Sequence, residues 1–254
     1  MKVAAVVVTY NRMELLNECL MGILRQTYPV NAIYIIDNAS TDGTYEFIMK
    51  KWFHEDILSG LEDERISIIE FPDGNNVELH YIRMPQNTGG AGGFYEGIKR
   101  AFNAGFDLLW LMDDDVEPAH DCLEKLMQYT AVSKCIHPSK FFKNGSPFYW
   151  EGYIDLITGK RVSLPDISFA NGKEYCFVNF GCFEGMLIHR SIVEKIGFPD
   201  QRFFIVYDDT IYGFLASLYT NVVYVKNALL IKKINNEVRP LTDRFIYYSV
   251  RNYF

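Results

Sequence analysis

The stretch Leu108-Leu109-Trp110-Leu111-Met112-Asp113-Asp114-Asp115 joins a strongly apolar run directly to three consecutive carboxylates. The apolar run is typical of a strand buried on both faces of a sheet, so the aspartates lie where that strand ends. Carboxylate oxygens suit hard ions such as Mg²⁺ and Mn²⁺, which also take substrate phosphates as ligands. The stretch therefore predicts a metal and phosphate site. The alternative is an acidic turn that caps a helix or faces water.

Three further apolar runs precede this strand, and each leads into a polar turn that opens a helix. The runs span Val3 to Val8, Ala32 to Ile36 and Leu79 to Arg83. The turns after them contain Thr9-Tyr10-Asn11-Arg12, then Asp37 to Gly43, then Asn87 with Gly89, Gly90, Gly92 and Gly93. This alternation predicts an α/β fold with a doubly wound, mostly parallel sheet, which binds ligands at the carboxyl ends of its strands.

The remaining sequence is less regular. The acidic stretch from about His54 to Asn76 gives no clear element, and beyond Pro118 the patterns predict a second, smaller lobe of one compact domain. Its expected elements are a helix around Asp121 to Tyr129, short strands from Ile136 to about Leu164, a strand from Phe177 to His189, helices at Ser191 to Ile196 and Asp209 to Leu218, a strand from Asn221 to Tyr224 and a final helix from Leu241 to Phe254. That last pattern stops without Gly or Pro, which leaves open whether the natural chain continues.

Composition excludes several classes of protein. With 254 residues and 49% apolar residues the chain has ample material for a core. A formal charge of −7 argues against nucleic-acid binding, which relies on a basic field. Apolar stretches are too short to span a bilayer and the N-terminus does not read as a signal peptide, so we expect a cytoplasmic protein. Five cysteines without metal spacing predict reduced, mostly buried thiols.

The C-terminal segment differs in charge from the rest. From Lys226 onward six basic residues stand against two acidic ones, a local net charge of +4, and several aromatic residues accompany them. Such a segment is either a solvated helix face or a surface that rests peripherally on an anionic membrane.

Five motifs follow one another along nearly the whole chain: Val7-Val8-Thr9-Tyr10-Asn11-Arg12, Gln26-Thr27-Tyr28-Pro29, Ile36-Asp37-Asn38-Ala39-Ser40-Thr41-Asp42-Gly43-Thr44, Asn87-Thr88-Gly89-Gly90-Ala91-Gly92-Gly93-Phe94 and Asp113-Asp114-Asp115. Together they resemble a family 2 inverting glycosyltransferase. The resemblance implies a GT-A fold with a Rossmann-like nucleotide-sugar-binding half (1–118), an acceptor-binding and catalytic half (119–240) and a C-terminal helical segment (241–254). The glycine motif and a later Phe-x-x-x-Asp-Asp segment are most similar to galactofuranosyl- and rhamnosyltransferase-like members.

The resemblance also assigns donor-binding roles. It implies a uridine pocket lined by Thr9, Asn11, Arg12 and Asp37, with Arg83 near the base or diphosphate. Asn87 and the glycines Gly89, Gly90, Gly92 and Gly93 would let the diphosphate approach backbone amides at a helix N-terminus; the alternative is a turn that merely packs. Asp113 and Asp115 would hold Mn²⁺ or Mg²⁺, with Asp113 facing either the ribose or the metal. Asp114 would either belong to the donor site or point into the structure toward residues that support the metal ligands.

The catalytic base implied by the resemblance is Asp209, in the pair Asp208-Asp209. The alternative for this pair is a helix N-cap, which is compatible with catalysis. Similar sequences often carry an acidic residue and an arginine where this chain has Ile211 and Leu215. They also often place a metal-binding histidine after the next strand, where this chain has Lys232 and Lys233.

The predicted function is metal-assisted, inverting transfer of a sugar, with UDP-galactofuranose as best donor, to a glycan or lipid-linked saccharide in cell-surface polysaccharide synthesis. Trp150 and Glu184 are candidate acceptor contacts, with core packing as the alternative. Rhamnosyl and hexopyranosyl transfer, and a catalytically impaired sugar-nucleotide-binding module, remain open. A NAD-dependent oxidoreductase is disfavoured because no GxGxxG motif follows the first strand.

Overall fold

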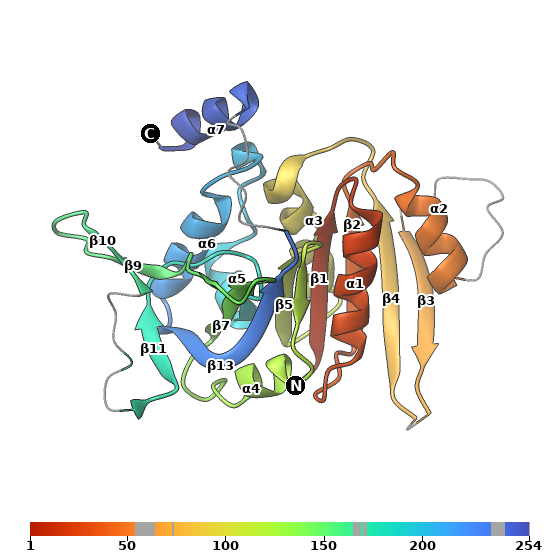
Figure 1. Ribbon diagram of the computed structural model, residues 1–254, viewed down its shortest axis with the longest axis horizontal. Helices are drawn as coiled ribbons and strands as arrows, with labels where there is room; N and C mark the ends of the chain where they lie inside the picture. Colours follow the sequence, from red (N-terminus) through yellow and green to blue (C-terminus); the bar gives the residue numbers. More distant parts are fainter. Residues whose placement is uncertain (54–63, 73, 165–168, 170–171, 235–241, 254) are drawn as a thin grey trace.

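The computed structural model describes residues 1–53, 64–72, 74–164, 169, 172–234 and 242–253. Within these ranges an 11-stranded mixed sheet runs in the order β11-β13-β7-β12-β5-β1-β2-β4-β3, with β6 beside β13 and β8 beside β7 (Figure 1). The strands are β1 Val3–Thr9, β2 Ala32–Asp37, β3 Glu64–Glu70, β4 Asn76–Arg83, β5 Leu108–Asp113, β6 Val116–Pro118, β7 Cys135–Phe142, β8 Pro147–Phe148, β11 Tyr175–Val178, β12 Leu187–His189 and β13 Val222–Lys232, with β9 Gly152–Ile154 and β10 Arg161–Ser163 forming a separate hairpin. The helices are α1 Met13–Leu24, α2 Thr44–Ile48, α3 Gly89–Asn103, α4 Cys122–Met127, α5 Arg190–Ile196, α6 Asp208–Ser217 and α7 Asp243–Tyr253, besides the short helices Met49–Phe53 and Gln201–Phe203.

The four central strands β5, β1, β2 and β4 are parallel, which confirms the expected doubly wound sheet. Their register brings the strand-end residues to one edge. Thr9 pairs with Asp37, Asp37 pairs with Arg83, and Val8 pairs with Asp113. The polar turns that follow these strands therefore meet at a single edge of the sheet, as the sequence predicts.

Two apolar layers cover the two faces of the sheet. Along β1, Val3, Ala5 and Val7 pack with apolar residues of α1 and α4, whereas Ala4 and Val6 pack with α3, α5 and α6. All of these β1 residues are fully buried, which is why the strand is an unbroken apolar run rather than an alternating one. Figure 1 shows α1 and α3 on opposite sides of β1.

Three sequence expectations need correction. The acidic stretch contains β3, an edge strand antiparallel to β4. Its Ile66 and Ile68 face solvent, so this strand lacks the buried apolar face by which strands are usually predicted. The single strand expected from Phe177 to His189 is two strands, β11 and β12. Residues 179–186 join the two strands. Gly185, where the chain enters β12, has a φ of +84° that favours glycine, and its Cβ would lie 2.4 Å from Pro138.

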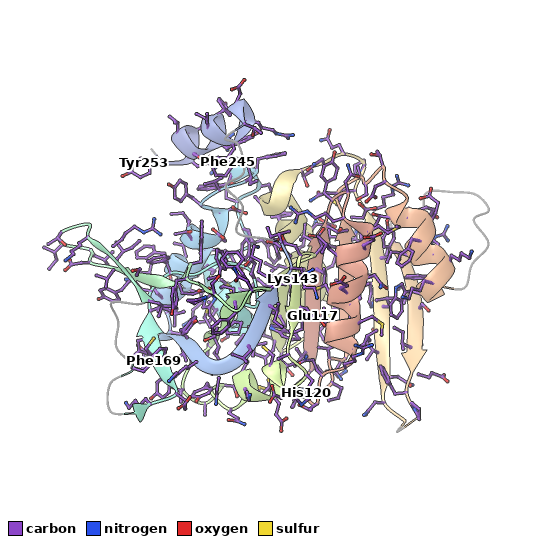
Figure 2. The ribbon with its side chains drawn as sticks, viewed as in Figure 1. Glu117, His120, Lys143, Phe169, Phe245 and Tyr253 are labelled. Carbon is purple, nitrogen blue, oxygen red and sulfur yellow. The ribbon has the colours of Figure 1, made fainter. Side chains whose placement is uncertain are left out.

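The last strand also differs from expectation, whereas the last helix agrees with it. β13 runs to Lys232, well beyond the expected end at Tyr224, and so carries Lys232 to the carboxyl edge of the sheet. α7 lies within the expected range, while that range's ends, Leu241 and Phe254, fall outside the described residues. Figure 2 labels Phe245 and Tyr253 on α7, at the top of the molecule in that view. Within the described ranges, each helix is too short or too polar to cross a membrane.

Candidate active site

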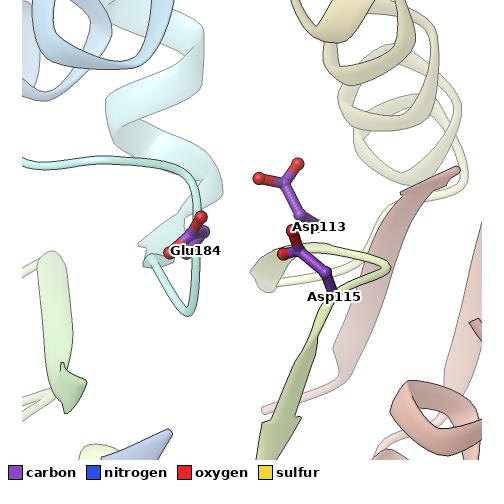
Figure 3. A group of neighbouring side chains, drawn as sticks. All are labelled: Asp113, Asp115 and Glu184. Atoms are coloured by element: carbon purple, nitrogen blue, oxygen red, sulfur yellow. The ribbon is translucent and has the colours of Figure 1, made fainter. Parts of the chain in front are cut away.

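Three carboxylates converge at the carboxyl end of β5. Asp113 ends this strand, Asp115 lies in the turn that follows, and Glu184 comes from residues 179–186. One oxygen of each lies within 4.8 Å of the others (Figure 3). The two aspartates predicted as metal ligands are therefore together. Glu184, predicted as an acceptor contact, lies against them, a placement that its sequence neighbours do not indicate; the acceptor contact stays a prediction.

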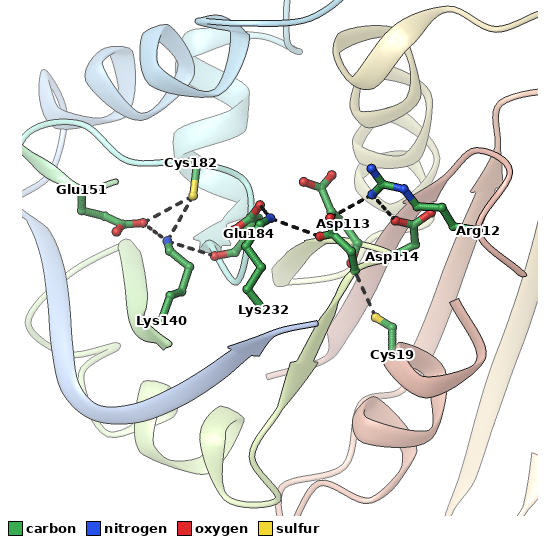
Figure 4. Close-up of polar contacts among 10 residues, drawn as sticks. Arg12, Cys19, Asp113, Asp114, Lys140, Glu151, Cys182, Glu184 and Lys232 are labelled. Atoms are coloured by element: carbon green, nitrogen blue, oxygen red, sulfur yellow. Dashed lines mark hydrogen bonds and ion pairs between the residues drawn. The ribbon is translucent and has the colours of Figure 1, made fainter. Parts of the chain in front are cut away.

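Two cations bind this cluster. The Lys232 ammonium lies 3.2 Å from Asp115 Oδ1 and pairs with Glu184 Oε1, and Arg12 Nη1 lies 2.9 Å from Asp115 Oδ2 and 3.0 Å from Asp114 Oδ1 (Figure 4). Burial lowers the pKa of Lys232, but the charges of Glu184 and Asp115 raise it above its usual range, so the ammonium stays protonated. Lys232 thus stands where similar sequences often carry a metal-binding histidine.

The charge of the cluster leaves room for a divalent cation. Four carboxylates, Asp113 to Asp115 and Glu184, face the two cations just named within the described part of the chain. Burial, with the charges of Glu184 and Asp115, raises the pKa of Asp113 well above its usual range, which is the mark of an uncompensated carboxylate. Glu184 Oε2 is buried and has no hydrogen-bond partner among the described residues. These oxygen donors fit Mg²⁺ or Mn²⁺.

The middle aspartate orients the β1–α1 turn. Asp114 is buried and accepts hydrogen bonds from Thr9 Oγ1 at 2.7 Å and from Arg12. Arg12, expected in a uridine pocket, is thereby drawn toward the carboxylates, with about a third of its side chain exposed. Asn11 holds the neighbouring turn, because its Oδ1 accepts from the Thr41 amide at 2.7 Å.

The second strand end is equally well ordered. Asp37 is fully buried and accepts from the Ser40 amide at 2.8 Å and from the Tyr81 hydroxyl. Arg83 donates to the Ser40 carbonyl at 3.0 Å and lies over the Tyr45 ring at 5.2 Å. Asp37 and Arg83 therefore flank the same turn, and their contact with a nucleotide stays a prediction.

The glycine motif opens α3 and serves two purposes. Asn87 Oδ1 accepts from the Gly89 amide at 2.8 Å, and Gly89 adopts a φ of +73° with no room for a Cβ, which would lie 2.0 Å from the Phe204 carbonyl oxygen. A Cβ on Gly93 would lie 2.5 Å from a Val8 methyl, and one on Gly92 would meet Thr88. Gly92 and Gly93 thus allow close packing, which is the alternative to diphosphate binding given for this motif.

The acidic pair Asp208-Asp209 forms the first turn of α6. The helix N-cap is Tyr207, so neither aspartate is the cap residue, although both benefit from the helix dipole. Burial raises the pKa of Asp208 to about 6, and burial together with the Asp208 charge raises the pKa of Asp209 to about 8. A Cβ on Gly90 would lie 3.8 Å from Asp208 Oδ2, so the glycine turn and the acidic pair face each other.

A second buried ion pair stands behind the cluster and has no counterpart in the sequence predictions. Lys140 pairs with Glu151, and its ammonium lies 3.1 Å from Cys182 Sγ and 3.5 Å from the Glu184 carbonyl oxygen (Figure 4). Lys140 and Glu151 are buried. Through these contacts with Cys182 and Glu184 the pair fixes the segment 179–186 and so positions Glu184.

The aromatic candidate Trp150 lies at the side of the cluster. Its ring centroid is 6.4 Å from that of Phe148, and the Lys232 ammonium lies 5.4 Å from the Phe148 centroid. Trp150 is 37% exposed, so it is not a core residue. An exposed ring next to Phe148 suits a sugar contact, which stays a prediction.

Solved structures share this fold. The chain superposes with a TM-score of 0.70 on GalNAc-T7 with UDP, GalNAc and Mn²⁺ (12% identity, 99% of this chain and 47% of that chain). It superposes with a TM-score of 0.63 on the mannosyltransferase PcManGT from Pyrobaculum calidifontis in complex with GDP-Man and Mn²⁺ (17% identity, 93% and 58%). The fold is the GT-A fold of glycosyltransferases.

Sequence comparison gives the family. The family model for glycosyl transferase family 2 matches residues 4–197, and the chain belongs to this family. The chain is 26% identical over 223 residues to galactofuranosyltransferase GlfT1 of Mycolicibacterium smegmatis, covering 82% of this chain and 62% of the relative. It is 23% identical over 167 residues to undecaprenyl-phosphate mannosyltransferase of Micrococcus luteus, covering 66% and 60%. The chain thus spans less than two thirds of the length of these relatives.

Proposed function

We propose that this chain is a metal-assisted, inverting transferase that moves galactofuranose from UDP-galactofuranose to a glycan or lipid-linked saccharide in cell-surface polysaccharide synthesis. The observation that carries the proposal is the acidic pair of α6, because Asp209 has a raised pKa and its neighbour Asp208 faces the glycine turn at the strand ends. A carboxylate whose pKa lies near neutrality is suited to general-base catalysis.

In the proposed reaction Asp209 accepts the proton of the acceptor hydroxyl while that oxygen attacks the anomeric carbon. The bond to the diphosphate breaks on the opposite side, so the anomeric configuration inverts and UDP leaves. The Gly90 amide at the start of α3 holds a diphosphate oxygen, since the Gly89 amide already donates to Asn87 Oδ1. Asp113, Asp115 and Glu184 would hold a divalent cation, which would supply positive charge to stabilise the leaving group. Lys232 adds positive charge beside it.

The remaining donor residues are proposed to bind the nucleoside. Thr9, Asn11 and Arg12 line the turn after β1, and Asp37 and Arg83 end the two neighbouring strands. Asp37 is buried behind the turn, so we expect it to shape the pocket through Ser40 rather than to reach far into it.

The choice of donor rests on the relatives. Galactofuranose is favoured because the galactofuranosyltransferase match covers 82% of the chain. The alternative sugars are mannose, other hexopyranoses and rhamnose. Mannose is included because the match to a mannosyltransferase covers 66% of this chain. Similar sequences often carry an acidic residue and an arginine where this chain has Ile211 and Leu215. The absence of these two charges favours a second candidate function, a module that binds a sugar nucleotide without transferring the sugar.

A transfer assay tests the proposal. UDP-galactofuranose, UDP-galactopyranose, dTDP-rhamnose and GDP-mannose are each offered with Mn²⁺ and lipid-linked or soluble saccharide acceptors, and UDP affinity is measured by calorimetry. We expect transfer from UDP-galactofuranose, its loss in Asp209→Asn, and UDP affinity in that variant within threefold of wild type. Tight UDP binding without turnover of any donor would establish the binding-module alternative instead.

Peripheral membrane contact is proposed for α7, whose residues Ile246, Val250 and Tyr253 recur at helical spacing and are 44%, 57% and 71% exposed. Such a face, with basic residues in the same segment, suits the interface of an anionic bilayer on the cytoplasmic side. Co-sedimentation with phosphatidylglycerol vesicles, compared with phosphatidylcholine vesicles, tests it. We expect Val250→Asp to reduce sedimentation at least fivefold; equal binding of variant and wild type would exclude this face.

A further inference from the structure

Residues 203–207, which lead into the acidic pair, have an unusual backbone. Phe204, Val206 and Tyr207 have φ values of +63°, +72° and +68°. Non-glycine residues rarely occupy this region, and a β-branched residue such as Val206 is a genuine outlier there. Strained backbone of this kind persists only where its surroundings fix it, and it concentrates at functional sites. The surroundings of this loop therefore matter for the residues that follow it.

The helix α7 supplies much of that support through two polar side chains. Asn252 Nδ2 lies 3.0 Å from the Phe203 carbonyl oxygen, 2.8 Å from that of Ile205 and 2.9 Å from that of Val206. Arg251 donates to the Phe203 carbonyl at 2.8 Å and to the carbonyl of residue 202. Within the described residues, carbonyls on both sides of Phe204 are thus held from a helix some fifty positions later in the chain.

Aromatic packing fixes the middle of the loop. The Phe204 ring stacks on Tyr248 with centroids 4.8 Å apart and planes 13° apart, and the Arg244 guanidinium lies 4.3 Å from the Phe204 centroid. The Phe204 carbonyl oxygen accepts from the Ala91 amide at 3.2 Å, in the first turn of α3. The loop therefore touches the glycine turn on one side and α7 on the other.

We infer that Asn252 and Arg251 are positioning residues that hold residues 203–207 in their strained conformation and so fix the start of α6, where Asp208 faces the glycine turn and Asp209 follows it. The part that concerns catalysis rests on the proposed function, whereas the ordering of the loop does not. Arg244, Tyr248, Arg251 and Asn252 recur along one side of α7, while Ile246 and Val250 lie on the other. One face of α7 thus packs against residues 203–207.

The test uses Asn252→Asp in the full chain. This substitution keeps the shape of the side chain, removes its two N–H donors and sets a carboxylate oxygen against carbonyl oxygens. Ser249→Ala, on the same helix but outside the contacts described, is the matched control. Hydrogen exchange followed by mass spectrometry reports the amides of 203–211, calorimetry reports UDP affinity, and the transfer assay reports kcat and KM separately.

In Asn252→Asp we expect at least tenfold faster exchange across 203–211, at least a tenfold lower kcat and UDP affinity within threefold of wild type, with Ser249→Ala unchanged in all three. Unchanged exchange in Asn252→Asp would overturn the inference whether or not the protein transfers sugar. Faster exchange with unchanged kcat would overturn the positioning role. An absence of transfer in wild type counts against the proposed function, and the exchange comparison still decides whether α7 orders the loop.

Discussion

Replacing Lys232 by methionine should destabilise the fold in a way that a divalent cation reverses. The side chains of Lys232, Asp115 and Glu184 are 10%, 4% and 10% exposed, so solvent screens this pair little. At 3.2 Å and an effective dielectric constant near 20 the attraction to Asp115 is about 5 kcal/mol. Removing one partner of a buried pair typically costs about 3–5 kcal/mol, because it leaves the other charge unpaired.

For a chain of this size each kcal/mol shifts the melting temperature by roughly 2–4 °C, so we expect Lys232→Met to melt about 10 °C lower than wild type in chelator. Added Mn²⁺ at a hundred times its dissociation constant should return about 2.7 kcal/mol. Differential scanning calorimetry with EDTA and with Mn²⁺ measures both. Lys233→Met is the control, since its partners Glu117 and Glu18 are 32% and 44% exposed and the change should cost less than about 1 kcal/mol. Equal melting temperatures for the two variants, or no stabilisation of Lys232→Met by Mn²⁺, would refute the reasoning.

Three further outcomes follow from the described contacts. Because Asp209 must be deprotonated to act as the proposed base and its raised pKa is about 8, kcat should rise with pH from 6 to 8.5, as a pH–rate profile will show. The same raised pKa makes the folded state lose stability as pH increases from about 4 to about 8, so Asp209→Asn should melt higher than wild type at pH 9. Lys140→Met should cost about 3–5 kcal/mol of unfolding free energy in urea titration, whereas Lys140→Met with Glu151→Leu should cost far less; equal costs would contradict this. Gly89→Ala should lower the melting temperature and slow transfer, because its φ of +73° is strained for alanine and its Cβ would clash with a carbonyl oxygen; wild-type behaviour would show that the turn yields.

Local patterns were enough to predict the central sheet. Val3 to Val8 and Leu108 to Met112 are long apolar runs with both faces buried, and each ends in polar residues, so strand type and the shared edge followed from the sequence. The grouping of Asp113 with Asp115 followed too, because both lie at the end of one strand.

Contacts between distant residues could not be predicted in the same way. Glu184 joins Asp113 because residues 179–186 leave the sheet between β11 and β12, and Lys232 joins them because β13 continues past Tyr224. Neither event leaves a local signal in composition or periodicity. The burial of Lys140 is a further case, since its partner arrives from another strand end and only the fold brings them together.

The sheet separates two layers that should respond differently to damage. α3 and α6, which begin with the glycine turn and the acidic pair, both pack on the layer that contains Val6, while α1 packs on the layer that contains Val7. Trimming Val7 would therefore loosen the molecule as a whole yet leave the relative placement of the glycine turn and the acidic pair intact. Trimming Val6, one position away and of the same residue type, would shift the support beneath both. Neighbouring positions of one strand can thus be used to separate the energetic cost of a cavity from its cost in alignment.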